Sequence, residues 1–120
     1  MNTPNKNNLL IENPNAATCS IYSYVLGHSE MCIAVYGTQD KPSRFIVFSF
    51  VEYFSGSTHW KGANLKIGTD DECIEILQNM TRFNKMPSNI LASRYKLYIF
   101  ESDIKQIQLI AAGTYITDKY

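Results

Sequence analysis

The strongest constraint on the fold of this chain is a capped, amphipathic helix predicted over residues 69–80, between two blocks of strand-like sequence. Thr69 and Glu72 match the capping-box pattern, in which an N-cap hydroxyl is followed three residues later by a carboxylate. Acidic side chains in the first turn also complement the positive end of the helix dipole. Apolar residues at helical spacing form one stripe: Cys73, Ile76, Leu77 and Met80. We therefore expect this stripe to pack on a sheet.

Strand-like segments flank the predicted helix on both sides. They are rich in β-branched and aromatic residues and are separated by turn-forming residues. Strands are expected at 19–26, 31–36, 44–54, 60–67, 94–100 and 106–116. This order predicts an α+β fold, in which a curved antiparallel sheet of about six strands (ββββ-α-ββ) packs against one helix. Because one helix cannot cover both faces of a broad sheet, either the sheet curls on itself or its free face meets a partner.

Residues 1–18 differ in composition from the rest of the chain. Asn and Pro recur there and favour turns over regular structure. We predict a flexible Asn/Pro-rich N-terminal arm over 1–18 and a single α+β domain over 19–120. Within the domain, Gly62 interrupts a predicted strand, which often marks a bulge or a close approach of two backbones.

Charge and cysteine content narrow the classes of partner and compartment. Eleven basic and eleven acidic side chains leave a formal net charge of zero, so no nucleic acid partner is expected. The apolar runs are short, and the N-terminus lacks a charged-then-apolar signal pattern, so no membrane association is expected. Three cysteines without a CxxC pair are typical of a reducing compartment, which predicts a cytoplasmic protein.

Residues suited to catalysis or metal binding are few and scattered. His28 and His59 are the only histidines in the chain. An enzyme hypothesis pairs His59 as a base with Cys32 or Ser57 as nucleophile, without a recognisable local motif. The cysteines and histidines lack the pair spacing of a zinc site, and the glycines lack the spacing of a phosphate-binding loop. No catalytic residue, metal ligand or cofactor is therefore predicted.

Aromatic residues are the remaining candidates for function. Eight Tyr, six Phe and one Trp are present, and most of the Tyr fall in predicted strands. Tyr and Trp combine buried ring area with a polar group and are enriched at interfaces. The candidate interface residues are Tyr22, Tyr24, His59 and Trp60. We expect Tyr22 and Tyr24 to share one strand face.

Three hypotheses about function follow from these observations. The first is a non-enzymatic protein-binding module, such as an adaptor, an inhibitor or an immunity-type protein, which binds another protein or itself through an aromatic-rich sheet surface. The second is a small-ligand-binding protein with a pocket between the helix and a curled sheet, near His59 and Trp60. The third, an enzyme that uses Cys32 or His59, has the least support.

Overall fold

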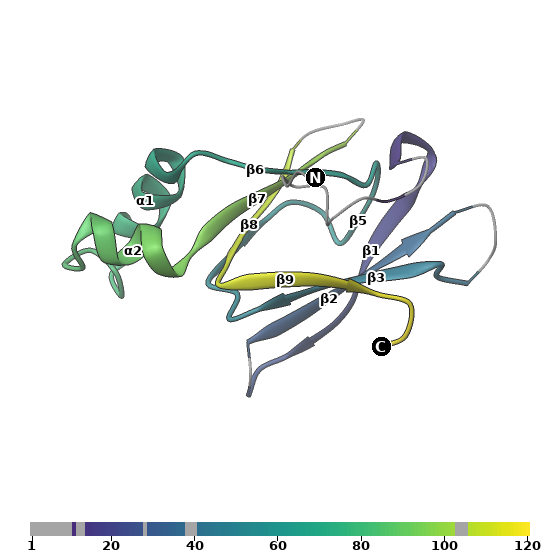
Figure 1. Cartoon of the computed structure of the whole chain (residues 1–120), viewed down its shortest axis with the longest axis horizontal. Helices are drawn as coiled ribbons and strands as arrows, with labels where there is room; N and C mark the ends of the chain where they lie inside the picture. Colours follow the sequence, from purple (N-terminus) through teal and green to yellow (C-terminus); the bar gives the residue numbers. More distant parts are fainter. Residues whose placement is uncertain (1–10, 12–13, 28, 38–40, 103–105) are drawn as a thin grey trace, which may run out of the picture.

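The chain forms two antiparallel sheets and a pair of short helices (Figure 1). The computed structural model describes residues 11, 14–27, 29–37, 41–102 and 106–120. The strands are β1 (Thr18–Val25), β2 (Glu30–Tyr36), β3 (Arg44–Ser49), β4 (Tyr53–Ser55), β5 (His59–Lys61), β6 (Asn64–Ile67), β7 (Lys96–Glu101), β8 (Ile107–Ala111) and β9 (Gly113–Thr117). The α-helices are α1 (Asp70–Gln78) and α2 (Ser88–Arg94), and η2 (Pro14–Ala16) is a short 3-10 helix.

The two sheets share one apolar core. The five-stranded sheet has the order β5-β1-β2-β3-β9, and the four-stranded sheet has the order β4-β8-β7-β6. Ile33 and Phe48 from the first sheet pack in the same buried cluster as Phe100 and Leu109 from the second. Phe48 and Phe100 make an edge-to-face contact, with ring centroids 6.3 Å apart. The sheets are therefore packed face to face, with apolar side chains alternating inward along each strand.

The predicted single curved sheet of about six strands is wrong, and three corners explain the difference. The predicted strand 44–54 breaks at Phe50, a residue with φ of 54°, into β3 and β4. The predicted strand 60–67 breaks after Lys61 into β5 and β6, and the predicted strand 106–116 breaks at Ala112 into β8 and β9. In each case the two halves belong to different sheets. Six predicted strands thus become nine, while the α+β class and the antiparallel pairing agree with the prediction.

The corners are held by backbone contacts. The Ala112 N–H donates to the Ser49 carbonyl at 2.9 Å, and the Glu52 N–H donates to the Ile110 carbonyl at 2.8 Å. The chain β3–β4 therefore stays hydrogen-bonded to the chain β8–β9 through the bend. At the corner between β5 and β6, Gly62 has φ of 114°, and a Cβ there would lie 2.7 Å from the Glu101 carbonyl oxygen. The close backbone approach predicted at this glycine is confirmed.

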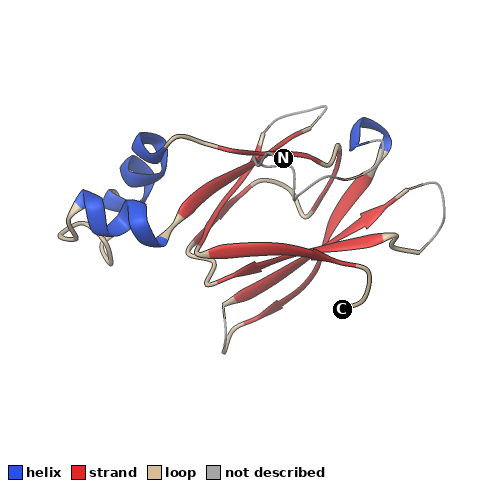
Figure 2. Cartoon of the chain, viewed as in Figure 1, coloured by secondary structure: helices blue, strands red, loops and turns tan. Residues whose placement is uncertain are grey.

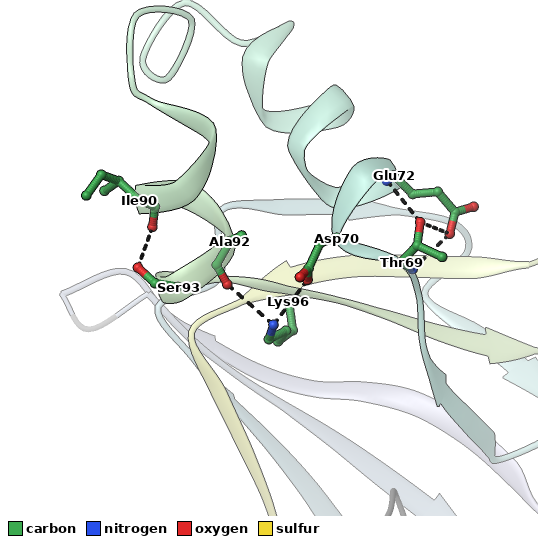
Figure 3. A network of polar contacts seen from close by, with 7 residues as sticks. All are labelled: Thr69, Asp70, Glu72, Ile90, Ala92, Ser93 and Lys96. Atoms are coloured by element: carbon green, nitrogen blue, oxygen red, sulfur yellow. Dashed lines mark hydrogen bonds and ion pairs between the residues drawn. The ribbon is translucent and has the colours of Figure 1, made fainter.

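Helix α1 forms as its sequence predicts. The Glu72 N–H donates to Thr69 Oγ1 at 3.1 Å, and the Thr69 N–H donates to Glu72 Oε1 at 3.0 Å, which completes the capping box (Figure 3). Cys73 and Leu77 are buried against β7, and the remaining members of the predicted stripe are partly buried in the same cluster. The predicted packing of this stripe on a sheet is confirmed. The helix ends at Gln78, two residues short of the prediction.

The second helix, α2, was not predicted from the sequence. Seven residues are too few to show a clear helical spacing of apolar side chains, and only Leu91 is fully buried. The helix is stabilised by packing rather than by its local sequence, because Leu91 lies in the cluster formed by α1 and the four-stranded sheet. Lys96 at the start of β7 joins the two helices, since its Nζ lies 3.1 Å from Asp70 Oδ1 and 3.3 Å from the Ala92 carbonyl (Figure 3).

Part of the segment assigned to the N-terminal arm contacts the domain. Ile11 and Ala17 are buried in the shared core, and the Pro14 carbonyl accepts a hydrogen bond from the Ala63 N–H at 2.8 Å. Residues 1–10 and 12–13 lie outside the described residues. In the described part of the chain, neither helix has the length or the apolar content needed to cross a membrane.

Candidate protein-interaction surface

The outer side of the five-stranded sheet is the candidate functional surface. The two α-helices, α1 and α2, pack on the four-stranded sheet, at the left end of the molecule in Figure 2. Within the described residues, neither α1 nor α2 covers the outer side of the five-stranded sheet. An uncovered sheet face is the outcome expected when too few helices are available for the sheets present.

An apolar layer lies just beneath this surface. Cys32 and Ala34 of β2 and Phe45 and Val47 of β3 form a separate buried cluster. They alternate with the inward-facing residues of the same strands, so they point away from the shared core. These side chains are buried without cover from α1 or α2 because larger side chains from neighbouring positions lie across them.

Tyrosines supply that cover. Tyr36 packs directly against the apolar layer, and Tyr115 stands opposite Val47 in the β3–β9 ladder, which places both side chains on the outer side. We call this surface the tyrosine face; its tyrosines are Tyr22, Tyr36, Tyr115 and Tyr120. Tyr22, Tyr115 and Tyr120 retain 53%, 51% and 46% of their accessible surface.

Ring contacts order one half of the tyrosine face. The Tyr22 ring lies 5.1 Å from the Phe45 ring and 6.2 Å from the Tyr120 ring, both in edge-to-face geometry. The Tyr120 hydroxyl donates to Glu30 Oε2 at 2.5 Å. This hydrogen bond to the Glu30 carboxylate raises the pKa of Tyr120, so the phenol stays protonated at neutral pH. The rings are therefore held in place before any partner binds.

A β-bulge separates the two tyrosines that were expected to share a face. The β1–β2 register shifts between Ile21 and Ser23, so the alternation of side chains is interrupted there. Tyr22 lies on the outer side against Phe45, whereas Tyr24 stands opposite Met31, a residue of the shared core. The expectation of a common face is wrong, because an insertion of one residue in a strand reverses the side-chain pattern beyond it.

His59 and Trp60 also lie on opposite sides of their strand. Trp60 is buried, and its ring centroid lies 5.1 Å from that of Phe100 in the shared core. Its indole N–H has no hydrogen-bond partner among the described residues. His59 is exposed and stands opposite Ser20. Since Ser20 also stands opposite Ala34 of the apolar layer, His59 lies at the rim of the tyrosine face. The structure thus brings Tyr22 and His59 to one side and Tyr24 and Trp60 to the other.

The geometry gives little support to nucleophilic catalysis by Cys32. Cys32 and His59 belong to strands that are separated by β1, which places their backbones about 10 Å apart from strand spacing alone. Burial raises the pKa of the Cys32 thiol to about 12, so the thiol is protonated at neutral pH. Ser57 is exposed in the turn before β5. His28 lies outside the described residues.

No candidate metal centre is present among the described residues, because no group of three or more His, Cys, Asp or Glu side chains converges there. An open cavity of about 400 Å³ lies at the β5–β6 corner, with Lys61, Asn64 and Glu101 on its walls. The Glu101 carboxylate already accepts from Lys66 at 2.9 Å and from Asn64 at 3.4 Å. The acidic group on the wall of this cavity is therefore already paired.

Comparisons with protein-family models, with curated proteins and with solved structures find no match to this chain. The tyrosine face therefore has to be interpreted from its own geometry. Three of its tyrosines, Tyr36, Tyr115 and Tyr120, were not singled out as site residues from the sequence. Tyr115 follows a buried strand in a β-rich segment, but its side depends on the corner at Ala112, which has no local sequence pattern.

Proposed function

We propose that this chain is a non-enzymatic protein-binding module and that its tyrosine face is the surface that binds the partner. One observation carries the proposal: three half-exposed tyrosines lie over a buried apolar layer that neither α1 nor α2 covers. Tyr buries a large rigid ring at a low entropic cost and keeps its hydroxyl available for hydrogen bonds, which is why it is frequent among hot-spot residues.

The charges around the tyrosine face favour a protein over a nucleic acid. Glu30 lies at the face beside the Tyr120 hydroxyl. Lys61 stands opposite Thr18 at the β5 edge, next to His59. The rim is therefore mixed in sign, whereas a nucleic acid surface needs a predominantly basic surround. A polar rim around an aromatic centre is the usual anatomy of a protein–protein interface.

The candidate residues take different roles in this proposal. Tyr22 is a central anchor because it is exposed, ordered by Phe45 and Tyr120, and located on the tyrosine face. His59 contributes to the rim. Trp60 supports the sheet from the shared core, and Tyr24 lies on the opposite side, where it lines a small cavity with Met31 and Val51.

Capture experiments with matched variants test the proposal. The tagged chain is used to capture proteins from extracts of its source cells, in parallel with a Tyr22→Ser, Tyr115→Ser double variant and a Tyr24→Ser control. Tyr24 is 42% exposed, so the control removes a comparable ring from the other side of the sheet. We expect specific partners to be lost with the double variant and retained with the control. Equal capture by all three forms would contradict a binding role for the tyrosine face.

The small-ligand hypothesis rests on the cavity at the β5–β6 corner rather than between helix and sheet. Its volume of about 400 Å³ falls in the range of ligand pockets. Ligand pockets are mainly apolar with a few free polar groups, whereas the Glu101 carboxylate on the wall of this cavity is already paired with Asn64 and Lys66. We therefore place the protein-binding function first.

A further inference from the structure

The free edge of β9 is a second surface of the five-stranded sheet. β9 is the last strand in the order β5-β1-β2-β3-β9 and pairs only with β3 in that sheet. It runs across the foreground in Figure 1, and no described element pairs with its other edge. The backbone N–H and C=O groups along that edge can form a ladder only with another extended strand.

Strand β9 lacks the features that usually protect an edge strand. Its five residues, Gly113–Thr117, contain no charged residue and no proline, and all of them after the glycine are β-branched or aromatic. The nearest acidic side chain, Asp118, is turned back toward Arg44 of β3 at 3.2 Å. By contrast, the opposite edge strand β5 has only three residues and carries Lys61.

We propose that β9 pairs with β9 of a second copy of this chain, antiparallel and about a two-fold axis at Tyr115. In this register Tyr115 faces its own copy on the outer side of the joined sheets. Thr114 stands opposite Ile116, and Gly113 stands opposite Thr117. The inference goes beyond the binding role of the tyrosine face, because it uses the backbone of the edge rather than the side chains of the face.

Self-complementarity identifies the occupant as a second copy. A two-fold axis brings the same patch of both chains together, so every residue of the edge must tolerate its symmetry partner. Two tyrosines at the axis form a favourable cross-strand aromatic pair, and no like charges oppose each other within the five paired residues. The joined sheets would have ten strands and would present two tyrosine faces on one side.

The extent of the edge sets the strength of the dimer. Five paired residues and their side chains bury much less than the roughly 1,200–2,000 Å² of a standard stable interface. A weak dimer is therefore expected, with a dissociation constant on the order of 10–500 µM.

Sedimentation equilibrium of the full chain, from about 5 µM to about 1 mM, measures the self-association that this inference predicts. The same measurement is made on variants with a charge substituted at the axis. Tyr115 is half exposed, so Tyr115→Lys and Tyr115→Glu leave the core intact. Each variant alone places two like charges opposite each other and is expected to weaken the dimer by about tenfold or more. An equimolar mixture of the two is expected to restore association, because Lys then stands opposite Glu. Such a rescue also shows that both variants are folded.

Tyr22→Lys serves as the matched control, because Tyr22 is equally exposed but lies three strands from the edge. It is expected to leave the self-association unchanged. A wild-type chain that stays monomeric at about 1 mM, or a mixture of the position-115 variants that stays monomeric, would overturn the edge dimer. A dimer that is broken by Tyr22→Lys would also overturn it and would point to the tyrosine face as the contact. Failure of the edge dimer leaves the partner-capture test unaffected.

Discussion

Replacement of Gly62 by alanine tests the corner that divides one predicted strand between the two sheets. At this position φ is 114°, a conformation that side-chain-bearing residues rarely adopt. An added Cβ would lie 2.7 Å from the Glu101 carbonyl oxygen and 3.4 Å from the Ser102 Cα. The nearest contacts are backbone atoms next to the β6–β7 ladder, so they cannot move aside as the end of a flexible side chain can.

Two opposing contributions set the size of the effect. A strained backbone conformation costs about 1–3 kcal/mol, and the contact with Glu101 adds to that cost. The lower entropy of the unfolded alanine chain returns about 0.4–1 kcal/mol. The net loss for Gly62→Ala is therefore expected to be about 2 kcal/mol or more. For a domain of this size, that loss lowers the melting temperature by about 8 °C.

Gly37→Ala is the matched control for this prediction. A Cβ added at Gly37 would have no heavy atom within 4 Å, and Gly37 has no positive φ, so its replacement is expected to be neutral or slightly stabilising. Thermal and urea unfolding of both variants, followed by circular dichroism, measure the difference. A Gly62→Ala variant as stable as Gly37→Ala would refute the close approach of the two backbones and the corner built on it.

Three further predictions concern the helix, its cap and the cysteines. Leu77 is fully buried between α1 and the sheet, so Leu77→Ala is expected to lower the free energy of unfolding by about 2–5 kcal/mol in urea titrations; a loss below about 0.5 kcal/mol would contradict the packing. The hydrogen bonds from Thr69 lower the pKa of Glu72, so its contribution to stability is present at neutral pH and is lost as pH falls through that lowered pKa. The melting temperature of Glu72→Gln is therefore expected to lie below that of the wild type at pH 7 and to equal it near pH 2. A difference in melting temperature that persists in acid would refute the ionised cap. All three cysteines are buried, with pKa values raised to about 12, 12 and 11, so thiol reagents at pH 8 are expected to label only the unfolded chain; rapid labelling under native conditions would contradict their burial.

Local sequence patterns predicted the elements whose causes are local. Helix α1 was predictable because its cap, its acidic first turn and its apolar stripe all lie within one short segment. The strand segments were found for the same reason, since alternation and β-branched residues are local properties. The close approach at Gly62 followed from the position of a glycine inside a strand pattern.

The arrangement of the sheets could not be predicted, because it depends on corners with weak local patterns. Phe50 adopts a positive φ although no glycine or asparagine marks the position. Ala112 lies at the corner between β8 and β9, where its N–H donates a hydrogen bond to Ser49, a residue distant in sequence. The β1 bulge likewise depends on pairing with β2, and it determines that Tyr22 rather than Tyr24 lies on the tyrosine face. The candidate interface was therefore only partly predictable.

Site-specific photo-cross-linking in the source cells tests the central claim, that the tyrosine face is a protein-binding surface, most directly. A photoreactive phenylalanine analogue replaces Tyr22 in one form of the chain and Glu75 of α1 in another. Both positions are exposed, and Glu75 belongs to the helix that packs on the other sheet. The proposal predicts a discrete cross-linked product with another protein from position 22 and none from position 75. An absence of products from position 22, or the same products from both positions, would contradict it.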